Sequence, residues 1–297
     1  QNKFTTEYHI QNKAQLIGFM RVVNGIEGVQ AANSLSGKTV YLDCDIMLND
    51  TTDWEYWGRY VYAESWEPIT TFLGTFDGQG HTISGLYIHG QADKDYTNTG
   101  LFGVVGIPGE DANAKICNVG IKASVFDLRE ITTRGDKIGL LAGNFLDGSA
   151  SQCFAHGKIV GNNIYYYIGG LIGLLGGQKV IQYGEAIVTD CYARVDIIST
   201  SQGVLGGIVG RNERTSLNNS FAAGRGWRYG ASNGSIANVY YDKQINTTAL
   251  QHGTYPSEVF RRVHLSASEL GGMQASLWCC SYKGNGTIRH QHRTWRC

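Results

Sequence analysis

Aromatic and arginine side chains crowd into one short segment near the start of the chain, and these are the residues best suited to binding. Flat amphipathic rings contact sugar faces and protein partners, and Trp, Tyr and Arg dominate the energetics of interfaces. The predicted ligand-binding residues are Trp54, Tyr56, Trp57, Arg59, Tyr60 and Tyr62, together with Tyr166 from a later run of three tyrosines. A competing interpretation is an Ω-loop that packs on itself and covers the side of the fold.

Carboxylates supply a weaker case for catalysis. Glu185, Asp190 and Asp196 are the nearest approach to an acidic cluster, and glycoside hydrolysis needs two carboxyl groups at a defined separation. Asp190 belongs to a repeated polar column described below, which already assigns it a structural role. Asp43 and Asp45 share one face if their segment is a strand, and we interpret them as structural rather than as a metal pair.

Motifs that would identify a zinc protease or a phosphate-binding loop are missing from the sequence. The chain contains no H-E-x-x-H and no G-x-x-x-x-G-K, which are the spacings typical of those two classes. We therefore predict no catalytic residues, no metal site and no cofactor.

Composition limits the fold and the partners. The 297 residues include 40 Gly but only 3 Pro, which favours a turn-rich β protein because Gly adopts the positive φ of tight turns. Lys and Arg total 25, as do Asp and Glu, so no basic field favours nucleic acid. No apolar run approaches the ~20 residues of a membrane helix. Gln1 does not begin a signal peptide, so we expect a secreted protein in mature form.

An internal repeat is the main observation in the sequence. One phrase recurs as Gly-Leu-Phe-Gly at 100–103, Gly-Leu-Leu-Ala at 139–142, Gly-Leu-Ile-Gly at 170–173 and Gly-Ile-Val-Gly at 207–210. The starts are about 31 to 39 residues apart, which is a solenoid period. Each short apolar stretch is bounded by Gly or Asn and has no 3.6-residue pattern, so the repeats are predicted to be strands of a coil.

A second phrase follows each of the first and defines two columns of equivalent residues. The polar column, in which side-chain amides are expected to form a ladder, contains Asn118, Gln152, Asp190, Asn219 and Asn238. The column of small residues contains Val119, Cys153, Cys191, Ser220 and Val239. Stacked strands hydrogen-bond to their equivalents at a spacing of ~4.8 Å, so Cys153 and Cys191 are predicted to be unpaired core residues.

The opening coil resembles a known family. Trp-Glu-Pro-Ile at 66–69 precedes Phe-Leu-Gly-Thr-Phe-Asp-Gly-Gln-Gly-His-Thr-Ile-Ser-Gly-Leu at 72–86, and these phrases are similar to those of GLUG-repeat proteins over roughly residues 4–242. The resemblance implies an all-β fold, a single-stranded right-handed parallel β-helix with a short N-terminal capping helix. It also implies a bacterial secreted or cell-surface location, as for putative adhesins and for the repeat regions of immunoglobulin A proteases.

The ends of the chain are predicted to differ from the repeats. We expect an N-terminal cap over 1–38, a β-helix over 39–245 and a C-terminal cap with an irregular tail over 246–297. Asn12 and Gln15 resemble a capping box, and the helical spacing places Leu16, Phe19, Met20 and Val23 on one face. Ser266 and Glu269 are expected to begin a closing helix, while Cys279, Cys280 and Cys297 are available for one disulfide in an oxidising compartment.

The functional prediction is a non-catalytic binding or adhesion scaffold that recognises a glycan or a host surface protein through loops on a rigid β-helix. Two alternatives remain open. One is a polysaccharide-degrading lyase or hydrolase, and the other is a non-catalytic repeat module of a protein similar to immunoglobulin A proteases. We predict no nucleic-acid partner and no membrane span, and the sequence leaves the oligomeric state undefined.

Overall fold

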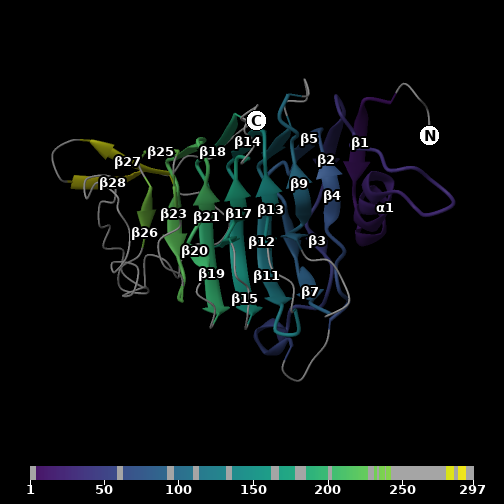
Figure 1. Cartoon of the computed structure of the whole chain (residues 1–297), viewed down its shortest axis with the longest axis horizontal. Helices are drawn as coiled ribbons and strands as arrows, with labels where there is room; N and C mark the ends of the chain where they lie inside the picture. Colours follow the sequence, from purple (N-terminus) through teal and green to yellow (C-terminus); the bar gives the residue numbers. More distant parts are fainter. Residues whose placement is uncertain are drawn as a thin grey trace.

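A computed structural model shows the chain as a parallel β-helix closed at one end by a helix (Figure 1). The residues that the structure describes are 5–58, 63–91, 97–109, 114–131, 136–161, 167–177, 185–199, 203–226, 231–232, 234–237, 239–241, 279–283 and 287–291. Their strands form four parallel sheets that run along the axis of the stack, which confirms the predicted fold class.

Neighbouring strands within a sheet come from successive coils. Sheet 1 contains β1 (Glu7–Ile10), β2 (Thr39–Leu42), β5 (Thr75–Asp77), β10 (Lys115–Cys117), β14 (Gly148–Ser151), β18 (Ala186–Thr189), β22 (Ser216–Asn218) and β25 (Ser235–Ala237). Sheet 2 contains β3 (Ile46–Met47), β6 (Thr82–Ser84), β11 (Gly120–Asp127), β15 (Phe154–Gly161), β19 (Tyr192–Ser199), β23 (Phe221–Ala223) and β26 (Tyr240–Tyr241), and β7 (Tyr87–His89) pairs with β11.

The other two sheets carry the glycine-led phrases. Sheet 3 contains β4 (Ile69–Phe72), β9 (Phe102–Val105), β13 (Ala142–Phe145), β17 (Ile172–Leu175), β21 (Val209–Asn212) and β24 (Ala231–Ser232). Sheet 4 contains β8 (Asn98–Thr99), β12 (Lys137–Ile138), β16 (Tyr167–Gly169) and β20 (Val204–Gly206). A coil therefore passes from sheet 1 through sheets 2, 4 and 3 before it returns to sheet 1 one layer further on.

The register corrects one of the predicted alignments. Phe102 pairs with Ala142, Ala142 with Ile172, and Ile172 with Val209. Ile138 nevertheless pairs with Thr99, so relative to the first repeat the phrase of the second repeat contains one extra residue and its end lies one position later than predicted. Its last residue is then Gly143, where an added Cβ would lie 2.4 Å from the backbone nitrogen of Thr99. Close packing of neighbouring backbones, rather than the leading glycine, decides this register.

The predicted polar column is a column of left-handed corners. Asn118, Gln152, Asp190 and Asn219 have φ values of 54°, 55°, 55° and 45°, and each lies between a strand of sheet 1 and a strand of sheet 2. Asn and Asp tolerate this conformation better than other residues with a Cβ. The Asn118 amide donates to the Asp77 carboxylate at 3.0 Å. Asn238 lies outside the described residues.

The small-residue column lies directly after these corners and is buried. Val119, Cys153, Cys191, Ser220 and Val239 are between 0% and 6% exposed. Neither Cys153 nor Cys191 forms a disulfide, which confirms their predicted role as unpaired core residues. Aromatic side chains fill the interior near the first coils, where Phe72, Phe76 and Phe102 are fully buried.

The N-terminal helix α1 (Lys13–Asn24) covers the open end of the stack (Figure 1). Its buried residues are the predicted Leu16, Phe19, Met20 and Val23, and the Phe19 ring lies 5.8 Å from the rings of both Phe72 and Phe76. Asn12 caps the helix by accepting from the Gln15 backbone N–H at 3.0 Å. The Gln15 side chain accepts a hydrogen bond from the backbone N–H of Gln11. A capping box would instead use the backbone N–H of Asn12.

The two ends of the chain differ from the repeats. Sheet 1 begins with β1, which lies before α1, and the segment 39–48 contains β2 and β3, which belong to different sheets. At the other end, β27 (Cys279–Lys283) and β28 (Thr287–Gln291) form an antiparallel hairpin that contains Cys279 and Cys280. The closing helix expected from Ser266 lies outside the described residues, and so does Cys297.

Substitutions at Gln152 test the left-handed corner. A residue with a Cβ pays roughly 1–2 kcal/mol in this conformation, so Gln152→Gly is expected to have a higher free energy of unfolding than Gln152→Val. At the half-buried strand position Ser149 in the same coil, the order should reverse because Gly weakens strands. Urea unfolding of the four variants measures both differences. Equal stability of the two Gln152 variants would contradict the corner assignment.

The buried thiols should resist alkylation in the native protein. Burial raises the pKa of Cys117 to about 12, and burial together with the neighbouring Cys191 raises the pKa of Cys153. The thiolate is the reacting species, so iodoacetamide should modify half-buried Cys44 well before Cys117, Cys153 and Cys191. Peptide mapping by mass spectrometry, before and after denaturation, provides the readout. Native-state labelling of Cys153 as fast as Cys44 would disprove a packed column.

Candidate functional site

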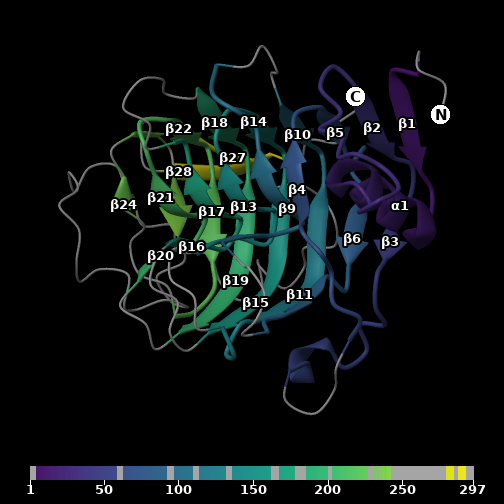
Figure 2. The ribbon, with the colours of Figure 1, turned by 45° about the vertical axis from the view of Figure 1, so that its right-hand side comes forward.

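The aromatic loop between β3 and β4 leaves the stack and folds against the outer face of sheet 2. Its short 3₁₀ helix η1 (Trp54–Tyr56) projects from the body of the molecule at the bottom of Figure 2. Trp57 anchors the loop, because its ring is only 4% exposed and packs with Tyr87 and Val125. The Trp57 and Tyr87 ring centroids lie 5.7 Å apart in an edge-to-face arrangement that is favourable for aromatic pairs.

A second anchor joins the loop to the end of β11. Arg129 donates to both oxygens of the Asp127 carboxylate at 2.7 Å and also to the Gly58 carbonyl. Gly58 has a φ of 78°, and an added Cβ would lie 2.2 Å from Asp127 Oδ2. Only glycine fits this close approach, so the loop reaches Asp127 because residue 58 has no side chain.

The outer face of sheet 2 provides the floor of a groove beneath the loop. Alternation along β15 and β19 points every second side chain outward, and the register places His156 beside Arg194 and Lys158 beside Asp196. Asp196 accepts from Arg225 of the next coil at 2.8 Å. Lys158 donates to the Glu55 carbonyl of the loop.

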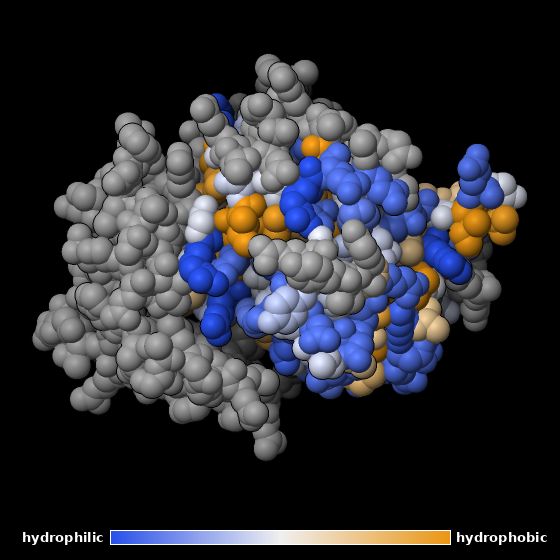
Figure 3. Space-filling model, turned by 90° about the horizontal axis from the view of Figure 1, so that it is seen from below, coloured by the Kyte–Doolittle hydropathy of each residue, from blue (hydrophilic) through white to orange (hydrophobic). Residues whose placement is uncertain are grey.

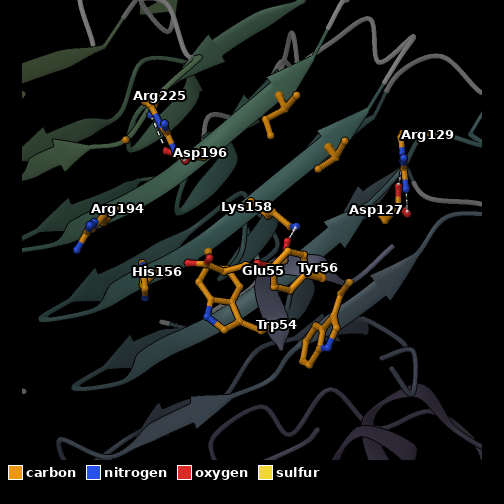
Figure 4. A pocket seen from close by; sticks show the side chains of 15 residues that line it. Trp54, Glu55, Tyr56, Asp127, Arg129, His156, Lys158, Arg194, Asp196 and Arg225 are labelled. Atoms are coloured by element: carbon orange, nitrogen blue, oxygen red, sulfur yellow. Dashed lines mark hydrogen bonds and ion pairs between the residues drawn. The ribbon is translucent and has the colours of Figure 1, made fainter. Parts of the chain in front are cut away.

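The groove has a volume of about 930 Å³, near the upper end of the range for small-molecule sites. Its lining residues are Trp54, Glu55, Tyr56, Trp57, Asp127, Arg129, His156, Gly157, Lys158, Val160, Arg194, Asp196, Ile198, Gly224 and Arg225. Figure 4 shows the Trp54 and Tyr56 rings over the strands beside His156 and Lys158. Viewed from below, the molecule presents a hydrophobic patch bordered by strongly hydrophilic residues (Figure 3).

His156 lines the groove beside Trp54 and is electrostatically unusual. Burial lowers the pKa of its imidazole from the ordinary value of 6.5, and the positive charge of Arg194 lowers it further. The Trp54 ring packs edge-on against the imidazole with centroids 5.3 Å apart. His156 is therefore neutral at physiological pH, which leaves it able both to donate and to accept hydrogen bonds.

The structure brings together part of the predicted binding set. Trp54 and Tyr56 line the groove, and Tyr56 is 55% exposed. Trp57 lies at the groove edge but is buried, so its role is to position the loop. Arg59, Tyr60, Tyr62 and Tyr166 lie outside the described residues.

The groove floor contains residues that sequence reasoning missed, namely Asp127, Arg129, His156, Lys158, Arg194 and Arg225. Alternation of apolar and polar residues over 154–161 and 192–199 was the available signal. That pattern identifies outward-facing positions, but it does not reveal which loop covers them.

The carboxylates considered for catalysis lie on different parts of the coil. Glu185 precedes β18 in sheet 1, Asp190 occupies the corner after β18, and Asp196 faces the groove from β19 in sheet 2. Asp43 accepts hydrogen bonds from His9, Gln11 and Gln79, and these bonds, led by that from His9, lower its pKa. Asp45 accepts from the backbone and hydroxyl of Thr82. Both aspartates fasten neighbouring coils together.

Comparisons with known proteins agree with the fold. An alignment of 171 positions, which covers 55% of the chain, shows 27% identity to halomucin of Haloquadratum walsbyi, and the match spans 2% of that protein's length. The fold is similar to the crystal structure of a "putative immunoglobulin A1 protease" from Bacteroides ovatus, with a TM-score of 0.53 and 18% identity, over 96% of this chain and 92% of that chain. No protein-family model matches the sequence.

The chain is thus a parallel β-solenoid, and this likeness establishes the fold alone. Among the described residues, no helix has the length and apolar character needed to cross a membrane.

The depressed pKa of His156 predicts an acid-dependent loss of stability. The unfolded chain binds this proton more readily than the folded one, so folding stability decreases as pH falls below about 6.5. His156→Gln removes this titration. As the pH is lowered from about 7 to about 5, the wild type should lose stability relative to the variant, so the free energy of unfolding of the variant minus that of the wild type should increase. Urea denaturation at both pH values measures the change. Parallel pH profiles of the two proteins would show that His156 is not held neutral.

Proposed function

We propose that this protein is a non-catalytic, extracellular carbohydrate-binding domain of the GLUG-repeat type, and that it binds its ligand in the groove between the aromatic loop and sheet 2. One observation carries the proposal. The Trp54 and Tyr56 rings overhang a rigid floor of charged and polar side chains. A sugar ring offers an apolar face to aromatic rings and hydroxyl groups to hydrogen-bonding side chains, so it matches both surfaces of the groove.

Preorganisation supports binding at this place. The floor belongs to hydrogen-bonded parallel strands, and the register between β15 and β19 is unbroken over their whole length. The loop is held by the Trp57 contact and the Asp127–Arg129–Gly58 anchor. Little conformational entropy remains to be lost when a ligand enters such a site, which favours affinity. A groove of this shape suits an extended chain better than the flat surface of a folded protein.

The state of the carboxylates favours binding over hydrolysis. A glycosidase keeps one carboxyl group protonated as a general acid and a second one available as a base or nucleophile. In this groove the oxygens of Asp127 are occupied by Arg129, and those of Asp196 by Arg225. Glu55 of the loop is the one lining carboxylate outside these two ion pairs, and a single carboxylate does not make the pair that hydrolysis needs.

The proposed location rests on the resemblance to secreted and surface-displayed repeat proteins. The name of the fold neighbour refers to immunoglobulin A1 as that protein's substrate. Immunoglobulins of this class act outside the cell, which supports an extracellular location.

Removing both overhanging rings tests the proposal. Trp54→Ala with Tyr56→Ala should weaken retention on a glycan and mucin array by more than about tenfold, because two stacking contacts are lost. Tyr41→Ala is the matched control, since Tyr41 is a partly exposed ring of sheet 1 that stacks on His9. Circular dichroism melting should give closely similar transitions for all three proteins. Array binding that survives in the double variant would refute the site, and an array with no bound glycan would refute the function.

A further inference from the structure

The groove carries more positive than negative side chains. Among its described lining residues, four are cationic, namely Arg129, Lys158, Arg194 and Arg225, and three are acidic, namely Glu55, Asp127 and Asp196. Two of the acidic residues are held in ion pairs, Asp127 with Arg129 and Asp196 with Arg225. With these pairs set aside, the floor retains Lys158 and Arg194 and the loop retains Glu55, which leaves an excess of one positive charge.

Arg194 presents this positive charge to the groove. Its side chain is exposed, and none of the ion pairs among the described residues involves it. The positive charge of Arg194 acts on the groove floor, because it contributes to the lowered pKa of His156. A guanidinium in such a position is suited to a planar anionic oxygen group, which it binds through two parallel hydrogen bonds.

The register places this guanidinium next to the aromatic loop. Trp54 packs on His156, and His156 pairs with Arg194 on the adjacent strand, one strand spacing of ~4.8 Å away. Figure 4 shows Arg194 and His156 on the same side of the groove as Trp54. A sugar ring stacked against Trp54 would carry its substituents toward Arg194.

From this juxtaposition we infer that the ligand is an acidic carbohydrate, whose sugar ring stacks on Trp54 and Tyr56 while a carboxylate or sulfate group on it binds Arg194. The inference rests on the proposed function and adds the chemical class of the ligand. Because the whole chain has a formal net charge of zero, attraction to a polyanion has to come from a local arrangement of charge such as this one.

Matched pairs of polysaccharides test the inference on the full chain. Polygalacturonate and its methyl ester differ in the carboxylate charge, whereas dextran sulfate and dextran differ in the sulfate group. We expect the anionic member of at least one pair to bind at least about tenfold more tightly than its neutral partner in a titration followed by tryptophan fluorescence. The pair that shows the difference identifies the anionic group.

Substitution of Arg194 assigns the effect to the groove. Arg194→Gln should reduce affinity for the anionic polysaccharide about tenfold and leave any binding of the neutral one unchanged. Arg21→Gln, in the capping helix, is the matched control. A second control, Arg289→Gln with Arg293→Gln, removes charge from the basic C-terminal segment, and both controls should bind as the wild type does.

The outcomes separate this inference from the function on which it rests. Equal affinity for the charged and neutral polysaccharides, lost in the Trp54 and Tyr56 double variant, would preserve carbohydrate binding and overturn the acidic ligand class. Anionic binding that persists in Arg194→Gln, or that disappears only in the C-terminal variant, would also overturn the inference. Absence of binding to all four polysaccharides would overturn it as well.

Discussion

Hydrogen bonding between each strand and its equivalent one coil away is the constraint on which this structure depends. A single coil cannot bury its apolar side chains, whereas a stack buries every inward position except those at the two ends. Register then becomes strict, because each corner and each side chain lies over its equivalent. The left-handed corners at Asn118, Gln152, Asp190 and Asn219 follow from this rule, since every coil has to turn at the same place.

The same constraint explains why the site lies on sheet 2. Strands β15 and β19 are eight residues long and alternate regularly, so they form the broadest ordered outer surface among the described strands. A rigid surface alone is flat and exposed to solvent. The loop between β3 and β4 converts it into a groove, because Trp57 and the Asp127–Arg129 pair fasten the loop to coils distant from it in sequence.

Electrostatics in the groove follows from this packing of coils. Lys158, Asp196 and Arg225 come from three successive coils and lie in one row across the strands. The register places Lys158 beside Asp196, and Asp196 accepts from Arg225. Burial beside this row keeps His156 neutral, and the positive charge of Arg194 acts in the same direction. The groove therefore combines the half-buried Trp54 ring, the exposed Tyr56 ring, a neutral imidazole and an exposed guanidinium. This pattern is suited to a ligand that is both polar and flat.

The repeat made the solenoid and its column of small buried residues predictable, because like residues recur at a period that only stacking explains. The capping helix was predictable from the helical spacing of its apolar residues. The aromatic loop was also recognisable as a surface insertion, since Trp54, Tyr56 and Trp57 interrupt the repeat. Sequence alone did not show that Trp57 is buried, nor that the phrase of the second repeat contains one extra residue. Tertiary structure decided both, together with the groove that joins Trp54 to His156 and Arg194, because these contacts link residues about a hundred positions apart that no local pattern relates.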